Sequence, residues 1–82
     1  MATQILRWVK GQGGTSRYYE AFVMRDLLQD RFLVLRWGRV GSPRGNSQQI
    51  PLTHDDEAEE ALAKVAKRRA ARGYVPCDPV QI

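Results

Sequence analysis

Hydrophobic and polar residues follow a strand period over the first fifty positions of the chain. In residues 17–27, apolar side chains occupy both alternating sets of positions. Because successive side chains of a strand point to opposite faces, both faces of this strand carry apolar groups, which is typical of a central strand. A third strand is expected over residues 31–40, around the apolar run at 32–35. A short turn at 28–30 would join the two strands into an antiparallel hairpin.

Two shorter strands are expected on either side of this hairpin. Residues 4–10 read as an edge strand in which Trp8 is expected to pack in the core or to be half-buried. After a Gly/Pro/Ser loop at 42–47, residues 48–52 read as a fourth strand. Pro51 has no N–H to donate to a strand ladder, so this fourth strand should also lie at an edge.

The pattern then changes to that of one long helix. Thr53 can cap its start, the helix runs to about Arg72, and Gly73 is a C-terminal stop. The apolar side of this helix is formed by Ala58, Ala61, Leu62, Val65, Ala66 and the stem of Arg69. The sequence therefore predicts an α+β fold, in which one long C-terminal helix packs on a small, mostly antiparallel sheet of about four strands. We expect a single domain over residues 1–76 and a loose tail over 77–82.

Composition narrows the class of protein. The 82 residues are 43% hydrophobic and 27% charged, and no apolar run approaches the roughly 18–20 residues that a membrane span needs. One cysteine, Cys77, excludes an internal disulfide, and with the single His54 it cannot complete a four-ligand zinc site. We expect a cytoplasmic monomer with no membrane association and no bound metal.

Catalysis has little support in the sequence. The single His54 cannot build a nucleophile–base–acid constellation, and Cys77 has no basic residue within four positions to lower its pKa. The glycine-rich segment at 11–14 is not followed by the Lys-Ser/Thr pair of a phosphate-binding loop. We therefore expect no enzyme activity and no cofactor.

Charge is distributed unevenly along the chain. The net charge is +4, but residues 1–54 carry eight basic and three acidic groups, and seven of the eight basic groups are arginine. Arginine makes the planar, bidentate phosphate contacts that lysine cannot match. This basic first part of the chain favours a polyanionic partner.

The densest candidate site is the stretch at 36–41. Arg36 and Arg39 lie on either side of Trp37, with Gly38 between the tryptophan and the second arginine. An aromatic plane beside fixed cations suits a stacked base or sugar and a phosphate. Arg44, in the loop that follows, is either a third cation of this site or an exposed loop charge.

The geometry of this site depends on whether the strand stays regular. Alternation separates Arg36 from Trp37 in a regular strand, whereas Gly38 and Gly41 would permit a bulge that aims both at one surface. The competing interpretation is a solvated strand end with no ligand.

The segment Trp37-Gly38-Arg39 resembles the signature of the WGR domain, which is named for these three residues. Further matches to the pattern of that family extend over roughly residues 5–75. They are residues 18–20, 32–35, 50–52, 56–58, 67–69 and 73–74. WGR domains occur beside the catalytic domains of DNA-damage-activated poly(ADP-ribose) polymerases and as small free-standing bacterial proteins.

The resemblance implies a non-catalytic nucleic-acid-binding module that recognises DNA ends or nicks. By similarity, Trp37 would stack on a terminal sugar or base, and Arg39 would contact phosphate or a neighbouring domain. Arg36 and Arg44 would add charge, and Gly38 would lie at the same site. The expected partner is DNA or RNA. The alternative is a protein-interaction adaptor that uses the same Trp/Arg surface, because both residue types are common interface anchors.

Overall fold

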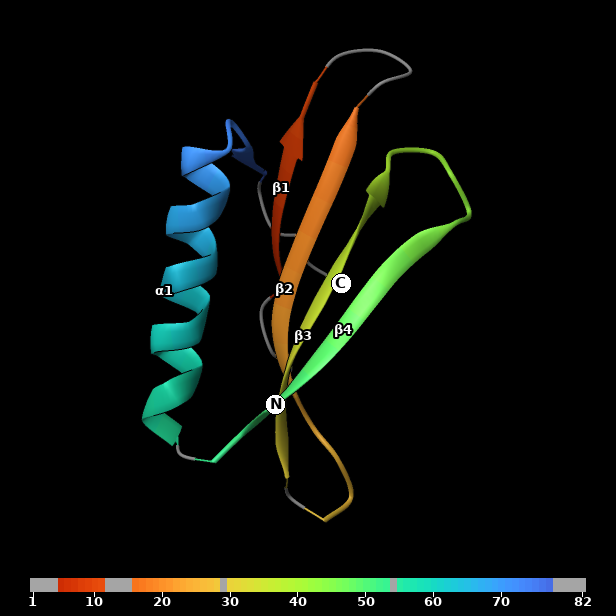
Figure 1. The fold of residues 1–82 in the computed structure, drawn as a ribbon. Coiled ribbons are helices and arrows are strands. Elements are labelled where there is room, and N and C mark those ends of the chain that lie inside the picture. The colour runs from red at the N-terminus through yellow and green to blue at the C-terminus, as the bar shows by residue number, and fades with distance from the viewer. Residues whose placement is uncertain (1–4, 12–15, 29, 54, 78–82) are drawn as a thin grey trace.

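The computed structural model describes residues 5–11, 16–28, 30–53 and 55–77 (Figure 1). In chain order the elements are β1 (Leu6–Lys10), β2 (Arg17–Arg25), β3 (Arg31–Arg39), β4 (Gly45–Leu52), α1 (Asp55–Ala71) and β5 (Val75–Cys77). The α+β fold with one long C-terminal helix is thus confirmed.

The strands form one antiparallel sheet in the order β4-β3-β2-β1-β5. As predicted, β2 is central and β4, with Pro51, lies at an edge. The expectation that the first strand also lies at an edge is wrong, because β5 pairs along its outer side, with Val9 opposite Val75 and Arg7 opposite Cys77. A three-residue strand is too short to show a period in the sequence.

The predicted tail boundary meets this fifth strand. Cys77, the first residue assigned to the tail, is the last residue of β5. Residues 78–82 lie outside the described part of the chain.

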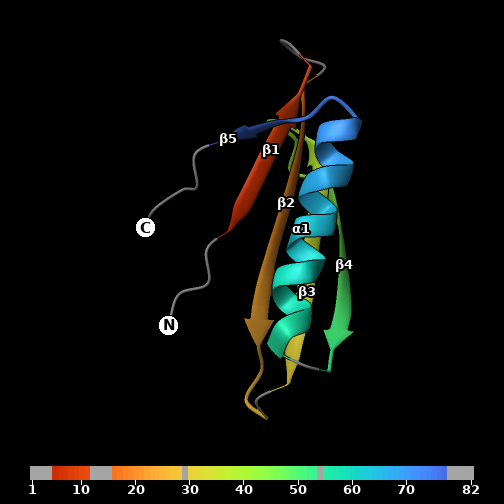
Figure 2. The same cartoon turned by 90° about the vertical axis from the view of Figure 1, so that its left-hand side faces the viewer.

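The molecule has two layers, with α1 lying across one face of the sheet (Figure 2). Between the layers, Trp8, Ala21, Leu33 and Leu35 form a buried core. Most of the predicted helix stripe packs against it, namely Ala61, Leu62, Val65 and Ala66. Within the described chain, no helix is long and apolar enough to cross a membrane.

The two ends of α1 are held by local hydrogen bonds. At the start, Thr53 donates both its N–H and its hydroxyl to the Glu57 carboxylate, at 3.1 and 2.8 Å. At the far end, Gly73 adopts φ +85° and donates its N–H to the Ala70 carbonyl, while the Tyr74 N–H bonds the Arg69 carbonyl at 3.0 Å. This pair of bonds is a Schellman motif. It turns the chain back so that Tyr74 faces the sheet and β5 can pair with β1.

Replacement of Gly73 by alanine should destabilise the fold. A residue with a Cβ costs roughly 1–2 kcal/mol in the left-handed region that Gly73 occupies. We expect a loss of that size for Gly73→Ala in urea denaturation, and a smaller loss for Gly73→Asn, because asparagine tolerates this conformation better. Equal losses for the two variants would contradict the backbone explanation.

Candidate nucleic-acid interface

The regularity of β3 decides which signature residues share a face. Pairing continues without a bulge to the end of the strand, where Trp37 lies opposite Tyr19 and Asn46 and Gly38 lies opposite Tyr18. Alternation therefore places Trp37 and Arg39 together on the side of the sheet that α1 covers. Arg36 lies on the opposite side, and the bulge that would have joined it to Trp37 is not formed.

The signature glycine has a steric role on the open side of the sheet. A Cβ added to Gly38 would lie 3.2 Å from Cε1 and from Oη of Tyr18, and 3.2 Å from the Arg44 carbonyl oxygen. A Cβ on Gly45, directly across from Gly38, would lie 2.7 Å from the Tyr18 hydroxyl oxygen. Since a Cβ at either position would crowd Tyr18, two neighbouring glycines make room for this ring.

Trp37 is half-buried, and Tyr19 holds its ring. The rings of Tyr19 and Trp37 are stacked, with centroids 5.9 Å apart and an angle of 14° between their planes. Tyr19 also makes edge contacts with Trp8, which is only 5% exposed, and with Tyr74. Trp37 is thus neither a core residue nor a free surface side chain, but the outer member of an aromatic stack anchored in the core.

Cations from the helix end and from β1 lie on this stack. The Arg69 guanidinium lies 4.1 Å from the centre of the Tyr19 ring and 5.2 Å from that of Tyr74. The Lys10 ammonium lies 5.8 Å from the centre of the Tyr74 ring. Contacts of this kind are cation–π interactions, and they add positive charge beside Trp37.

One row of the sheet carries three cations side by side. In the pairing register, Lys10 lies opposite Arg17, and Arg17 lies opposite Arg39. Each of these cations is two residues away from an aromatic residue of the same strand, namely Trp8, Tyr19 or Trp37. All three side chains therefore lie on the same face of the sheet as those rings. Like charges at directly opposed positions, with Cβ atoms about 5 Å apart, destabilise a sheet. An anion bound between them would relieve that repulsion.

A shallow hollow of about 290 Å³ lies between this row and the aromatic stack. Its described lining is Arg17, Tyr18, Trp37, Gly38, Arg39, Asn46 and Tyr74. No carboxylate occurs among these lining residues. An aromatic wall, an amide and two guanidiniums can together hold a planar or sugar group and the phosphate attached to it.

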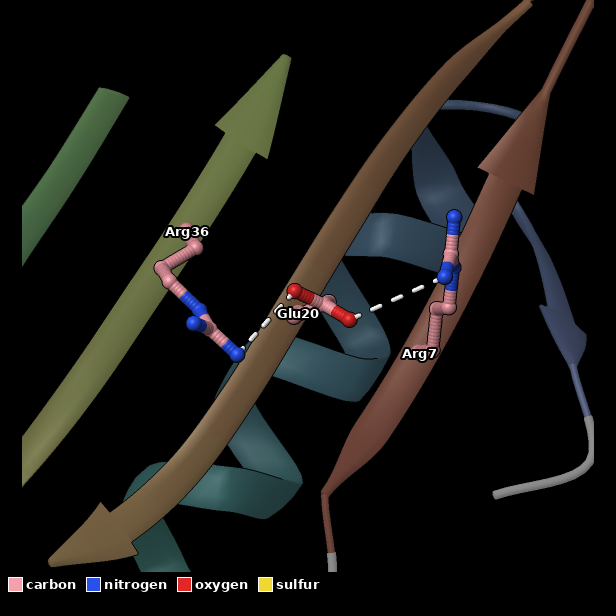
Figure 3. A network of polar contacts seen from close by, with 3 residues as sticks. All are labelled: Arg7, Glu20 and Arg36. Atoms are coloured by element: carbon pink, nitrogen blue, oxygen red, sulfur yellow. Dashed lines mark ion pairs between the residues drawn. The ribbon is translucent and has the colours of Figure 1, made fainter. Parts of the chain in front are cut away.

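Arg36 is engaged elsewhere. On the open side of the sheet its Nη2 lies 3.4 Å from Oε1 of Glu20, and Nη1 of Arg7 lies 3.9 Å from Oε2 of the same carboxylate (Figure 3). The Arg36 guanidinium also lies 4.9 Å from the centre of the Phe22 ring. Arg36 therefore shares a single carboxylate with Arg7, and it faces away from the hollow.

Arg44 lies in the exposed loop between β3 and β4. Its N–H donates to the Ser42 hydroxyl at 3.2 Å, which orders the backbone of the loop. Its carbonyl is close to Gly38, next to the hollow, but its side chain does not line the hollow. Of the predicted site residues, the structure brings Trp37, Gly38 and Arg39 together.

The sequence did not reveal the other members of this surface, which are Lys10, Arg17, Tyr19, Arg69 and Tyr74. The predicted hairpin did contain one signal for the position of Arg17. In a hairpin of the predicted kind, a residue near the start of the second strand must pair with one near the end of the third. The exact register, which brings Arg17 opposite Arg39, depends on where the turn closes.

Comparison with known proteins identifies the family of this chain. The family model of the WGR domain matches residues 2–81, so the chain belongs to the WGR domain family. The WGR family is non-catalytic, and membership is consistent with nucleic-acid binding in general. No curated protein and no solved structure matches the chain. The described residues also contain no group of three or more His, Cys, Asp or Glu side chains that could hold a metal ion.

Crowding by Tyr18 leads to a test of the glycine pair. Gly45→Ala should cost about 1–3 kcal/mol in urea denaturation, because the new methyl group overlaps the Tyr18 hydroxyl. In a Tyr18→Phe background the cost should fall, since the next ring atom, Cζ, is 4.0 Å away. An equal cost in both backgrounds would show that Tyr18 does not set the requirement for glycine.

Proposed function

We propose that this protein is a non-catalytic module that binds DNA at strand ends or nicks. The observation that carries the proposal is the row of Lys10, Arg17 and Arg39 beside Trp37, at a hollow whose described lining contains no carboxylate. Three adjacent cations favour a ligand with closely spaced negative charges, and a terminal nucleotide with its phosphates has them.

The aromatic stack supports the preference for an end. Bases inside a duplex are already stacked on their neighbours, and their rings are not available to a side chain without unstacking. At an end or a nick, a terminal base or sugar is open on one side, and Trp37 can cover it while Arg17 and Arg39 bind the adjoining phosphates. Tyr19 holds the indole in place, so little conformational entropy is lost on binding.

Fluorescence anisotropy with three DNA ligands tests the proposal directly. The ligands are a duplex with a 5′-phosphorylated nick, the same duplex without the nick, and a single strand. To remove free ends, both duplexes are closed by hairpin loops. We expect tightest binding to the nicked duplex. Absence of binding to it at low salt would contradict DNA recognition, and equal binding to both duplexes would contradict the preference for ends.

Salt dependence should report the cation row. If three phosphates are neutralised, the logarithm of the association constant should fall with the logarithm of salt concentration at a slope of about −3. Arg17→Gln and Arg39→Gln should each weaken binding and reduce the slope by about 0.9. Arg25→Gln, the same change at the other end of the sheet, is the matched control and should leave the slope unchanged. A flat salt dependence would instead favour the protein-interaction alternative.

Removal of the indole should weaken binding without changing the salt slope. Trp37→Ala should cost about 1–3 kcal/mol of binding free energy if the ring stacks on the ligand. Trp37→Phe, which keeps an aromatic face, should recover part of that loss. Circular dichroism and urea denaturation of both variants separate binding from folding. Unfolding of Trp37→Ala would mean that the stack with Tyr19 is primarily structural.

A further inference from the structure

The turn between β2 and β3 presents two leucines to solvent. It projects beyond the helix and beyond the end of β4 (Figures 1 and 2). Leu27 is 100% exposed and Leu28 is 80% exposed. Side chains this exposed bury almost no surface within their own chain, so they add almost nothing to its stability.

Hydrogen bonds nevertheless link the described residues of this turn. The Asp26 carboxylate accepts the N–H groups of Leu28 and Asp30, both at 2.9 Å, and the Asp26 N–H donates to the Asp30 carbonyl at 3.0 Å. We call Asp26, Leu27, Leu28 and Asp30 the hairpin tip. It offers two adjacent aliphatic side chains between two carboxylates, while Arg25 and Arg31 form the next pair behind it.

An apolar cleft of about 240 Å³ lies on the other flank of the same chain, between α1 and strands β3 and β4. Its aliphatic lining is Leu33, Leu35, Ile50, Leu52, Ala61 and Val65, and Tyr19 of the aromatic stack lines it too. Basic side chains of the helix, Lys64, Arg68 and Arg69, line it as well. Nε of Arg69 is buried and has no hydrogen-bond partner. The cleft therefore pairs an aliphatic lining with basic side chains.

The hairpin tip and the cleft match in size. An engineered apolar cavity of about 150 Å³ holds benzene, a molecule of six carbons. By the same ratio a cleft of 240 Å³ accommodates the eight carbons of two leucine side chains beyond Cα. It is partly open to solvent and not an enclosed cavity.

The hairpin tip and the cleft also match in charge. With the leucines in the cleft, Asp26 and Asp30 would meet Lys64 and Arg68 on its rim. The two carboxylates lie at the outer end of the hairpin, in front of Arg25 and Arg31, so the part of the tip that meets a partner favours a basic surface. A second copy of this chain supplies both the aliphatic and the basic parts.

In contrast to the monomer expected from the sequence, we propose that the chain self-associates by inserting the hairpin tip of one copy into the cleft of another. The contact joins two different surfaces, so it is heterologous rather than a pairing of identical patches. It uses neither Trp37 nor the row of Lys10, Arg17 and Arg39. The cleft shares Tyr19 and Arg69 with the aromatic stack, but the variants below change neither residue. Self-association is measured without DNA, so its failure is distinguishable from a failure of DNA binding.

Complementation between two variants tests this contact. The tip variant, Leu27→Ser with Leu28→Ser, keeps an intact cleft, and the cleft variant, Lys64→Glu with Arg68→Glu, keeps an intact hairpin tip. By sedimentation velocity, the wild-type chain should associate as its concentration rises from 10 μM to 1 mM. Each variant alone should remain monomeric, with at least a tenfold weaker association. An equimolar mixture should form a 1:1 complex, because the hairpin tip of one variant fits the cleft of the other.

Matched substitutions exclude general effects of polarity and charge. Val75→Ser removes another exposed aliphatic side chain, and Lys67→Glu reverses another exposed charge on the same helix. Both should associate like the wild type. Asp30→Lys is a second tip variant that leaves the leucines in place, and it should weaken association as well. Circular dichroism verifies that each variant is folded.

Three results would overturn the proposal. They are a wild-type chain that stays monomeric at 1 mM, a cleft variant that associates as the wild type does, and an equimolar mixture that remains monomeric while the wild type associates. The second result would indicate contact between two hairpin tips.

Discussion

The unbroken antiparallel register between β2 and β3 is the constraint on which the rest of the structure depends. It brings Tyr19 opposite Trp37, Glu20 opposite Arg36 and Arg17 opposite Arg39. A shift of one residue would move every side chain of one strand to the other face, and the aromatic stack, the shared carboxylate and the cation row would all be lost together. Leu33, Leu35 and Ala21 are buried beneath the helix. Their burial fixes that register, because only this pairing turns all three side chains toward the core.

At the signature, two glycines leave room for a large side chain on the open face of the sheet. Gly38 and Gly45 leave space for the Tyr18 ring on the open side, so that β3 reaches its end without a bulge. On the other side, Gly73 turns the chain after the helix and brings Tyr74 and Arg69 against the Tyr19 ring. Small residues thus position large ones, and the aromatic surface beside the candidate site is assembled from three separate parts of the sequence.

The basic groups of this chain fall into distinct environments with distinct consequences. Arg7 and Arg36 share the single Glu20 carboxylate on the open face, which offsets one of their two positive charges. The described residues that line the hollow beside the cation row include no carboxylate. The cation row is therefore the better candidate for binding phosphate. The cations on the rim of the cleft adjoin aliphatic surface, which suits an acidic and aliphatic segment. The net charge of +4 would not distinguish these environments.

By itself the sequence determined the class of fold, the central place of β2, the edge position of β4, the helix stop at Gly73 and the family signature around Trp37. These features depend on short-range periodicity, on the missing N–H of proline and on the backbone freedom of glycine, all of which are local properties. Only the tertiary structure decided that β5 covers β1, that Arg36 faces away from Trp37, and that Lys10 and Arg17 join Arg39. Such neighbours are far apart in the chain, and a pairing register fixed by packing of the whole core brings them together.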